Sequence, residues 1–241
     1  MKILSIGNSL SQDAQRYVHA LAKHEGVELR AVNLYIGGCP LRKHYLNMLD
    51  DNAYYDYEFN GEKTGLKVSI RQALVSDDWD CVTLQQASLV SDKFETYNPY
   101  LQALAEYVKK YCPNAKLLIH QTWAYKKDSP HLVNKMGYAT PEDMFAKVAE
   151  CYDRAAALIG ADGMIPSGAA MLRAYQLGGE DLYFDDVHAS RGTGRYLLAL
   201  CWFKYLTGKD IIGNGFSEFD VPVTDTDREI AIQAVNEVLK L

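Results

Sequence analysis

Short apolar runs alternate along this chain with longer segments in which apolar residues recur every three or four positions. The short runs are typical of buried strands, and the longer segments are typical of amphipathic helices. Strands are predicted at residues 2–6, 27–36, 79–85, 116–119 and 164–166. Helices are predicted at residues 13–22, 40–51, 70–75, 99–111, 141–159, 168–177, 190–206 and 224–239. Strands that alternate with helices in this way indicate a parallel sheet covered by helices on both faces.

One segment interrupts the alternation of strands and helices. Residues 54–59 have the alternating pattern of an extended chain, and Asn60-Gly61 follows them. Asn-Gly between two extended runs is the strongest short-range signal for a tight hairpin. We therefore predict a β-hairpin over residues 54–69, near the strand ends, where it is positioned to wall a pocket. The complete prediction is a single α/β domain over residues 1–241: a three-layer α/β/α sandwich with about five parallel strands and this small hairpin insertion.

The composition is that of a globular protein, with 48% hydrophobic and 23% charged residues in a chain of 241. The formal net charge of -6 argues against a nucleic-acid-binding protein, which needs a basic face. No run approaches the roughly 18 apolar residues of a membrane span. No secretory leader precedes the first strand. The chain is therefore expected to be cytoplasmic as given, or to be an exported protein whose leader has been removed.

The five cysteines are widely spaced and never occur as a C-x-x-C pair. An odd, scattered set fits neither a disulfide framework nor a zinc site. Cys81 and Cys201 lie in apolar segments and are expected to pack as small hydrophobic side chains. No metal site is predicted.

Residues suited to ligand binding follow the first three predicted strands directly. Gly7-Asn8-Ser9 follows the first strand, Gly37-Gly38 follows the second, and Gln85-Gln86 closes the third. In an open α/β sheet, ligands bind outside the carboxyl ends of the strands, where free N–H groups at a helix start and in glycine turns can approach them. Ser9 is therefore a candidate nucleophile at a strand-to-helix turn. The alternative is that Ser9 or Ser11 only caps the helix that follows.

Asp185 and His188 lie three residues apart in a polar loop that leads into a helix. A serine hydroxyl is a poor nucleophile at neutral pH, so an imidazole must take its proton and a carboxylate must hold that imidazole in one tautomer. Ser9, His188 and Asp185 supply these three groups. Asp186 is the rival to Asp185, because one residue of slippage in a loop would exchange them. The alternative interpretation is a surface or capping pair, since three residues is also ordinary helical spacing.

In order and spacing, these motifs resemble the SGNH (GDSL-like) hydrolase superfamily. The family's G-D-S block after the first strand is matched by Gly7-Asn8-Ser9, with Asn8 in place of the acid. Gly38 matches a glycine of the second block, and 185–188 (DDVH) matches the late D-x-x-H block. The third block, normally G-x-N-D, does not match, because this chain has QQAS at 85–88. The resemblance is to a divergent bacterial branch with a GNS first block and a LQ-x-x-S third block, and it implies a flavodoxin-like sheet.

The resemblance implies that Ser9 attacks an ester carbonyl, that His188 relays the proton to the leaving alcohol and that Asp185 orients His188. The oxyanion would be held by the N–H groups of Ser9 and Gly38 together with a glutamine amide from the third strand end. No metal or organic cofactor is implied. The implied function is that of a serine esterase that removes a small acyl group, acetyl, from a carbohydrate or another polar substrate.

Neighbouring strand residues point to opposite faces, so only one of Gln85 and Gln86 can face the pocket. The resemblance favours Gln85, because Gln85 takes the glycine position when this segment is laid on the family's third block. The alternative is that Gln85 bonds a neighbouring loop and supports the site from behind. Asn8, Gln86 and Trp123 are expected to contact the substrate. Trp123 suits stacking on a sugar ring, with ordinary packing as the alternative.

Two other functions stay open at this point. A lipase or thioesterase acting on longer acyl chains would need a long apolar groove. A catalytically silent member that binds glycans or a partner protein is suggested by the missing third block. Neither a nucleic-acid partner nor a membrane span is expected, and the oligomeric state and the acyl acceptor are not predicted.

Overall fold

A computed structural model of the chain describes residues 1–240, and within them one mixed sheet has the strand order β4-β3-β2-β1-β5-β6-β7. The strands are β1 (Lys2–Gly7), β2 (Arg30–Tyr35), β3 (Tyr55–Phe59), β4 (Glu62–Val68), β5 (Cys81–Leu84), β6 (Lys116–His120) and β7 (Gly163–Ile165). The strands β2, β1, β5, β6 and β7 are parallel, which confirms the predicted central sheet of five. Counted along the chain, they have the order 2-1-3-4-5 of a flavodoxin-like sheet.

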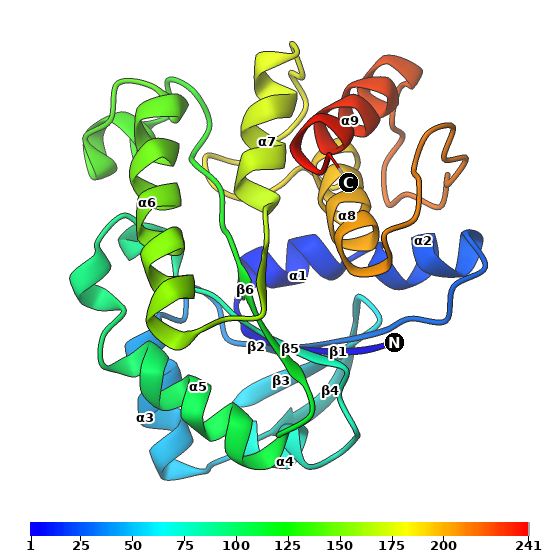
Figure 1. Ribbon diagram of the computed structural model, residues 1–241. Coiled ribbons are helices and arrows are strands. Elements are labelled where there is room, and N and C mark those ends of the chain that lie inside the picture. The colour runs from blue at the N-terminus through cyan, green and yellow to red at the C-terminus, as the bar shows by residue number, and fades with distance from the viewer. Residues whose placement is uncertain (241) are drawn as a thin grey trace.

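Helices cover both faces of the sheet, so the predicted three-layer sandwich is also confirmed (Figure 1). One face packs against α1 (Ser9–Gln15), α2 (Val18–His24), α7 (Ser167–Gln176), α8 (Thr193–Thr207) and α9 (Asp225–Val238). The other packs against α3 (Leu41–Asp50), α4 (Ile70–Leu74), α5 (Tyr100–Tyr111) and α6 (Pro141–Ile159). Shorter turns of helix occupy Ser88–Val90, Phe94–Thr96 and His131–Met136. Strand side chains alternate between the two cores: Ile3 is buried in the first and Leu4 in the second.

The predicted hairpin is present and extends the sheet at one edge. β3 and β4 pair antiparallel around Asn60 and Gly61, which have φ values of 53° and 82°. A side chain at Gly61 would also meet the Arg16 carbonyl, since a Cβ there would lie 2.3 Å from that oxygen. β3 pairs antiparallel with β2, and the hairpin lies beside the helix that begins at Ser9, since the Gln12 side chain of that helix donates to Glu58 of β3.

The first helical segment differs from the prediction of one helix over 13–22. The structure has two short helices, α1 and α2, separated at Arg16 and Tyr17. The Tyr17 hydroxyl donates to the Arg191 carbonyl and accepts from the Asp220 N–H at 2.8 Å. These partners lie far along the chain. The break between α1 and α2 therefore coincides with tertiary contacts and not with a local helix-breaking residue. α1 also begins at Ser9, four residues earlier than predicted.

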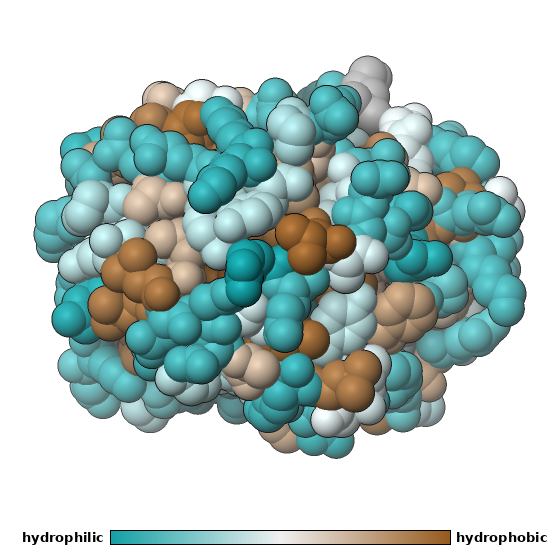
Figure 2. Space-filling model, turned by 90° about the horizontal axis from the view of Figure 1, so that it is seen from below, coloured by the Kyte–Doolittle hydropathy of each residue, from teal (hydrophilic) through white to brown (hydrophobic). Residues whose placement is uncertain are grey.

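The surface that carries α3, α4 and α5 is mainly hydrophilic and is interrupted by separate hydrophobic areas (Figure 2). No helix within residues 1–240 is both long and apolar enough to cross a membrane. The five cysteines, all within the described residues, are buried and unpaired. Cys81 and Cys201 belong to the hydrophobic core on the α8 side, as their apolar surroundings in the sequence predict.

Candidate active site

Ser9 is held at the point where β1 passes into α1. Asn8 is the N-cap of α1, and its side-chain oxygen accepts a hydrogen bond from the Leu10 N–H at 3.0 Å. The Ser11 hydroxyl accepts in turn from the Asn8 N–H at 3.0 Å. Asn8 therefore caps the helix, and the alternative in which Ser9 or Ser11 does so is wrong. As the first residue of α1, Ser9 keeps a backbone N–H without a partner inside the helix.

Ser9, His188 and Asp185 form one continuous line of hydrogen bonds. The Ser9 Oγ lies 2.9 Å from His188 Nε2, and His188 Nδ1 lies 2.8 Å from Asp185 Oδ2. The other carboxylate oxygen, Asp185 Oδ1, accepts from the backbone N–H groups of Val187 and His188, both at 2.7 Å. An ionised Asp185 accepts from Nδ1–H, so Nε2 is the nitrogen left to accept the serine proton.

The pKa of Asp185 is lower than that of a free aspartate. Partial burial raises this pKa, but the hydrogen bonds from the His188 N–H, the His188 ring and the Val187 N–H together outweigh the burial. The side chain remains 46% exposed. The carboxylate is therefore ionised at neutral pH beside the imidazole.

Asp186 has a different partner, which separates the two rival acids. Its Oδ2 lies 2.8 Å from His131 Nδ1, and its carbonyl accepts from the Lys126 N–H at 2.9 Å. Of the two acids, Asp185 is the one bonded to His188. Asp186 instead ties the loop that carries His188 to the segment after β6.

Gly37 and Gly38 form the turn after β2, and both are exposed. Gly38 has a φ of 60°, a conformation that favours glycine. The Cys39 N–H closes the turn by donating to the Ile36 carbonyl at 3.2 Å. No acceptor among residues 1–240 is bonded to the Gly38 N–H. The role of this N–H group as an oxyanion donor stays a prediction.

Gln85 does not contact the open site, contrary to the sequence prediction. Its side chain is in the interior, and the residue is only 2% exposed. Its Nε2 donates to the Asn8 side-chain oxygen at 2.8 Å, and its Oε1 accepts from His120 Nδ1 at 2.7 Å. These bonds match the alternative in which Gln85 supports the site from behind. A polar strand end could be recognised in the sequence, but the direction of its amide could not.

Behind Gln85, a buried series of hydrogen bonds continues through His120 to α7 and α8, which lie on the same face of the sheet as α1. His120 Nε2 lies 3.1 Å from the Ser167 hydroxyl, which accepts from Trp202 Nε1 at 3.1 Å. Burial lowers the pKa of His120 to about 3, so the ring is neutral and can donate from Nδ1 while accepting at Nε2. At its other end, this series of hydrogen bonds reaches Asn8, the residue before Ser9.

The three residues predicted to contact the substrate are also interior. Asn8 is 1% exposed, and its Nδ2 donates to the Cys39 carbonyl at 3.2 Å. The Gln86 Oε1 accepts from the Leu41 N–H at 2.9 Å, and its Nε2 donates to Thr96. Trp123 donates from Nε1 to the Val187 carbonyl at 2.8 Å. Each therefore holds a segment around the site and none presents its polar group to solvent.

Asp13 is a residue of the site that sequence analysis missed. It lies one helical turn after Ser9 and accepts a hydrogen bond from the Ala189 N–H at 3.1 Å. The i, i+4 spacing from Ser9 was the available signal, because it places both side chains on one face of a helix.

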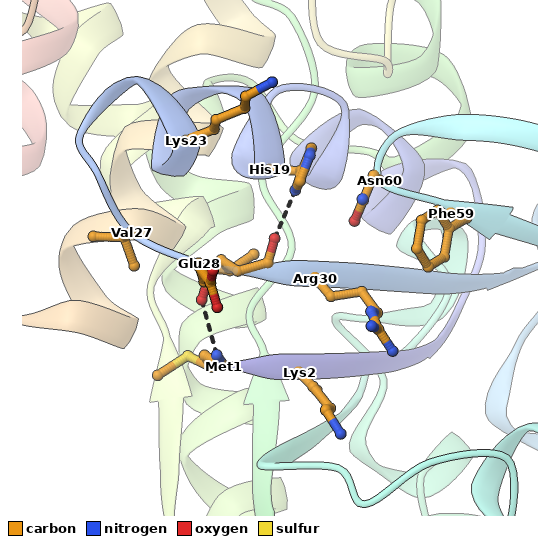
Figure 3. Close-up of a pocket in the computed structure, with 10 residues that line it drawn as sticks. Met1, Lys2, His19, Lys23, Val27, Glu28, Arg30, Phe59 and Asn60 are labelled. Carbon is orange, nitrogen blue, oxygen red and sulfur yellow. Dashed lines mark hydrogen bonds between the residues drawn. The ribbon is translucent and has the colours of Figure 1, made fainter.

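Two cavities lie at the end of the sheet away from Ser9, where the parallel strands begin. A cavity of about 490 Å³ is drawn in Figure 3, with His19, Lys23 and Arg30 around the first residues of the chain. A second, of about 750 Å³, is lined by residues such as Trp79 and Asp162. Neither contains Ser9, His188 or Asp185. Within residues 1–240, no group of three or more His, Cys, Asp or Glu side chains is arranged to hold a metal ion.

The model of a family described as a domain of unknown function, DUF4886, matches residues 2–236. The crystal structure of a DUF4886 protein from Bacteroides uniformis is 31% identical, with a TM-score of 0.90 over 100% of this chain and 95% of that one. A search of curated proteins finds no match.

Two further solved structures share the fold. A protein from Slackia heliotrinireducens that is assigned to the SGNH hydrolases is 29% identical, with a TM-score of 0.62 over 86% of this chain and 98% of that one. An acetylxylan esterase from Geobacillus stearothermophilus is 15% identical, with a TM-score of 0.53 over 86% of this chain and 94% of that one. At this identity, the second likeness concerns the fold alone.

Proposed function

Since this chain belongs to the DUF4886 family and has the fold of the SGNH and GDSL-like hydrolases, we propose that it is a serine hydrolase of carboxylic esters. Its substrate is a small acyl ester, an acetyl group on a carbohydrate or another polar acceptor. The observation that carries the proposal is the line of hydrogen bonds from Ser9 through His188 to Asp185, at 2.9 and 2.8 Å.

The proposed reaction begins with attack of Ser9 Oγ on the ester carbonyl. His188 Nε2 takes the serine proton as the new C–O bond forms, and it gives that proton to the leaving alcohol as the tetrahedral intermediate collapses. Water then attacks the acyl group on Ser9 in the same way, with His188 as the base, and releases the acid. Asp185 holds the ring and stabilises the imidazolium that forms in each half-reaction.

The negative oxygen of the intermediate is held by backbone N–H groups in this proposal. The Ser9 N–H at the start of α1 and the Gly38 N–H in the glycine turn are the two donors. A donor of this kind typically contributes about 10²–10³ in kcat. Gln85 acts indirectly, because its amide is bonded to Asn8 and to His120.

The surroundings of Ser9 favour a short acyl group. Hydrogen-bonded polar side chains, Asn8, Gln85 and His120, fill the interior behind it, where a long acyl chain would need an apolar channel. A sugar acceptor is favoured by Phe184, which directly precedes Asp185 and is 59% exposed. The Arg191 guanidinium lies 4.5 Å from the centre of that ring. An exposed aromatic ring beside the triad is suited to stacking on a sugar.

The experiment compares turnover of p-nitrophenyl acetate with that of p-nitrophenyl octanoate. The wild type is expected to prefer the acetate, and Ser9→Ala is expected to lose several orders of magnitude in kcat. Ser217→Ala, at an exposed serine, is the matched control and keeps wild-type turnover. Preference for the octanoate would replace the proposal with a lipase or thioesterase. If the folded wild type showed no Ser9-dependent turnover of either ester, the protein would instead be a catalytically silent binding protein.

A further inference from the structure

Asp13 joins the two segments that carry Ser9 and His188. The residue is 2% exposed, one turn after Ser9 on α1. One carboxylate oxygen, Oδ2, accepts from the Ala189 N–H at 3.1 Å, and Ala189 is the residue next to His188. The other, Oδ1, accepts from Arg195 Nε at 2.9 Å. A single buried carboxylate therefore bonds to the backbone beside the proposed base and to α8.

This bridge acts close to the contact that the proposed reaction needs. Ser9 and His188 are 179 residues apart in sequence, and their side chains meet at 2.9 Å. Asp13 supplies a second link between the same two segments, one helical turn from the first. Two neighbouring links fix orientation as well as distance. Misplacement of a reacting group by about 1 Å can cost about 10²-fold in rate.

Asp13 belongs to a network of charged side chains that includes Arg195. The pKa of Asp13 is raised, because burial outweighs the attraction and the hydrogen bond of the Arg195 guanidinium. Arg195 also pairs with Asp220 at 3.3 Å, and Asp220 pairs with Arg16 at 2.6 Å. The carboxylate is close enough to His188 for the two to interact electrostatically.

We propose that Asp13 is a positioning residue that holds His188 against Ser9 through the Ala189 N–H. The inference rests on the proposed function, since it concerns the same serine and histidine. It adds a residue outside the Ser9, His188 and Asp185 set. A purely structural buried ion pair would stabilise the fold without affecting the Ser9 to His188 contact.

The kinetic test uses Asp13→Ala and Asp13→Asn with p-nitrophenyl acetate, at a temperature at which each variant is fully folded. Asp13→Ala is expected to lower kcat about 10²-fold with KM within about threefold, because orientation and not binding is lost. Asp13→Asn keeps an oxygen for the Ala189 N–H, so its loss is smaller, about tenfold. Glu237→Gln, which breaks the remote Arg173 to Glu237 pair, is the control and keeps wild-type kcat. Wild-type kcat in both Asp13 variants would overturn the inference.

A second measurement does not depend on turnover. In protein labelled with ¹⁵N-histidine, Ser9→Ala is expected to shift the His188 Nε2 resonance, because it removes the hydroxyl bonded there. In protein that already carries Asp13→Ala, adding Ser9→Ala is expected to shift the His188 Nε2 resonance little, because the Ser9 to His188 hydrogen bond is already lost. An equal shift in both backgrounds would overturn the inference. Failure of the proposed function is distinct: it is the absence of Ser9-dependent turnover in the wild type.

Discussion

Replacement of Gln85 by alanine separates a supporting role from a direct catalytic one. The change removes the acceptor of His120 Nδ1–H and the donor to Asn8. His120 is 0% exposed, so its ring N–H would be left buried without a partner. Asn8 would keep its bond from the Leu10 N–H and would still cap α1. The main expected consequence is therefore loss of stability and not loss of the catalytic line.

The size of the effect follows from these bonds. A buried donor left without a partner costs about 1–3 kcal/mol, and the loss of a typical hydrogen bond adds about 1 kcal/mol. The free energy of unfolding is expected to fall by about 2–4 kcal/mol. For a chain of this size, that corresponds to roughly 5–15 °C in Tm. kcat is expected to fall by less than about tenfold, well short of the 10²–10³ typical of a lost oxyanion donor.

The assays are urea unfolding, thermal unfolding and turnover of p-nitrophenyl acetate. Gln85→Met keeps a similar side-chain volume without the hydrogen bonds, so it separates polar from packing effects. Gln176→Ala, at an exposed glutamine of α7, is the control and is expected to change neither stability nor kcat. An unchanged Tm with a 10²–10³-fold fall in kcat for Gln85→Ala would refute the supporting role and make Gln85 an oxyanion donor.

Two further predictions concern the triad acid and the buried histidines. Asp185→Asn is expected to lower kcat by several orders of magnitude, and Asp186→Asn, which only loosens the bond to His131, by less than about tenfold. A larger loss of kcat in Asp186→Asn than in Asp185→Asn, measured by steady-state kinetics, would contradict the assignment of the triad acid. Burial lowers the pKa of His44 and His120 to about 3, so these rings stay neutral in the fold while the unfolded chain takes up protons below pH of about 6.5. The free energy of unfolding is therefore expected to fall as pH drops from about 6.5 toward 3. Urea unfolding across this range should show a smaller fall for His44→Gln than for the wild type, and an equal fall in both would contradict the prediction.

The alternating pattern predicted the layers of the fold because most of the parallel strands are buried on both faces and most of the helices mainly on one. α8 is an exception, since it is buried on all sides. Asn60 and Gly61 predicted the hairpin because their positive φ values are what a tight turn demands. The interruption of the first helix could not be predicted. Its partners, Arg191 and Asp220, lie far along the chain from Tyr17, and no local residue marks the break.

In the candidate site, too, some residues could be predicted from the sequence and others could not. Ser9 and His188 could be identified because each follows a recognisable local pattern at a predicted strand or helix boundary. The positions of Gln85 and Trp123 could not, because a sequence gives the polarity of a side chain and not its direction. Their partners, His120 for Gln85 and the Val187 carbonyl for Trp123, are set by packing between separate segments. Buried amides and indoles near a site thus appeared as candidate ligand contacts although they hold the site's framework.

Covalent labelling of Ser9 tests the central claim most directly. An activated phosphonate ester with a p-nitrophenolate leaving group is attacked by a nucleophilic serine and leaves a stable phosphonyl group on its oxygen. We predict one phosphonyl group per chain, found by mass spectrometry of the peptide that contains Ser9. Labelling should be much slower in His188→Ala, absent in Ser9→Ala and unchanged in Ser217→Ala. A phosphonyl group on another residue, or equal labelling of Ser9→Ala and wild type, would contradict the account.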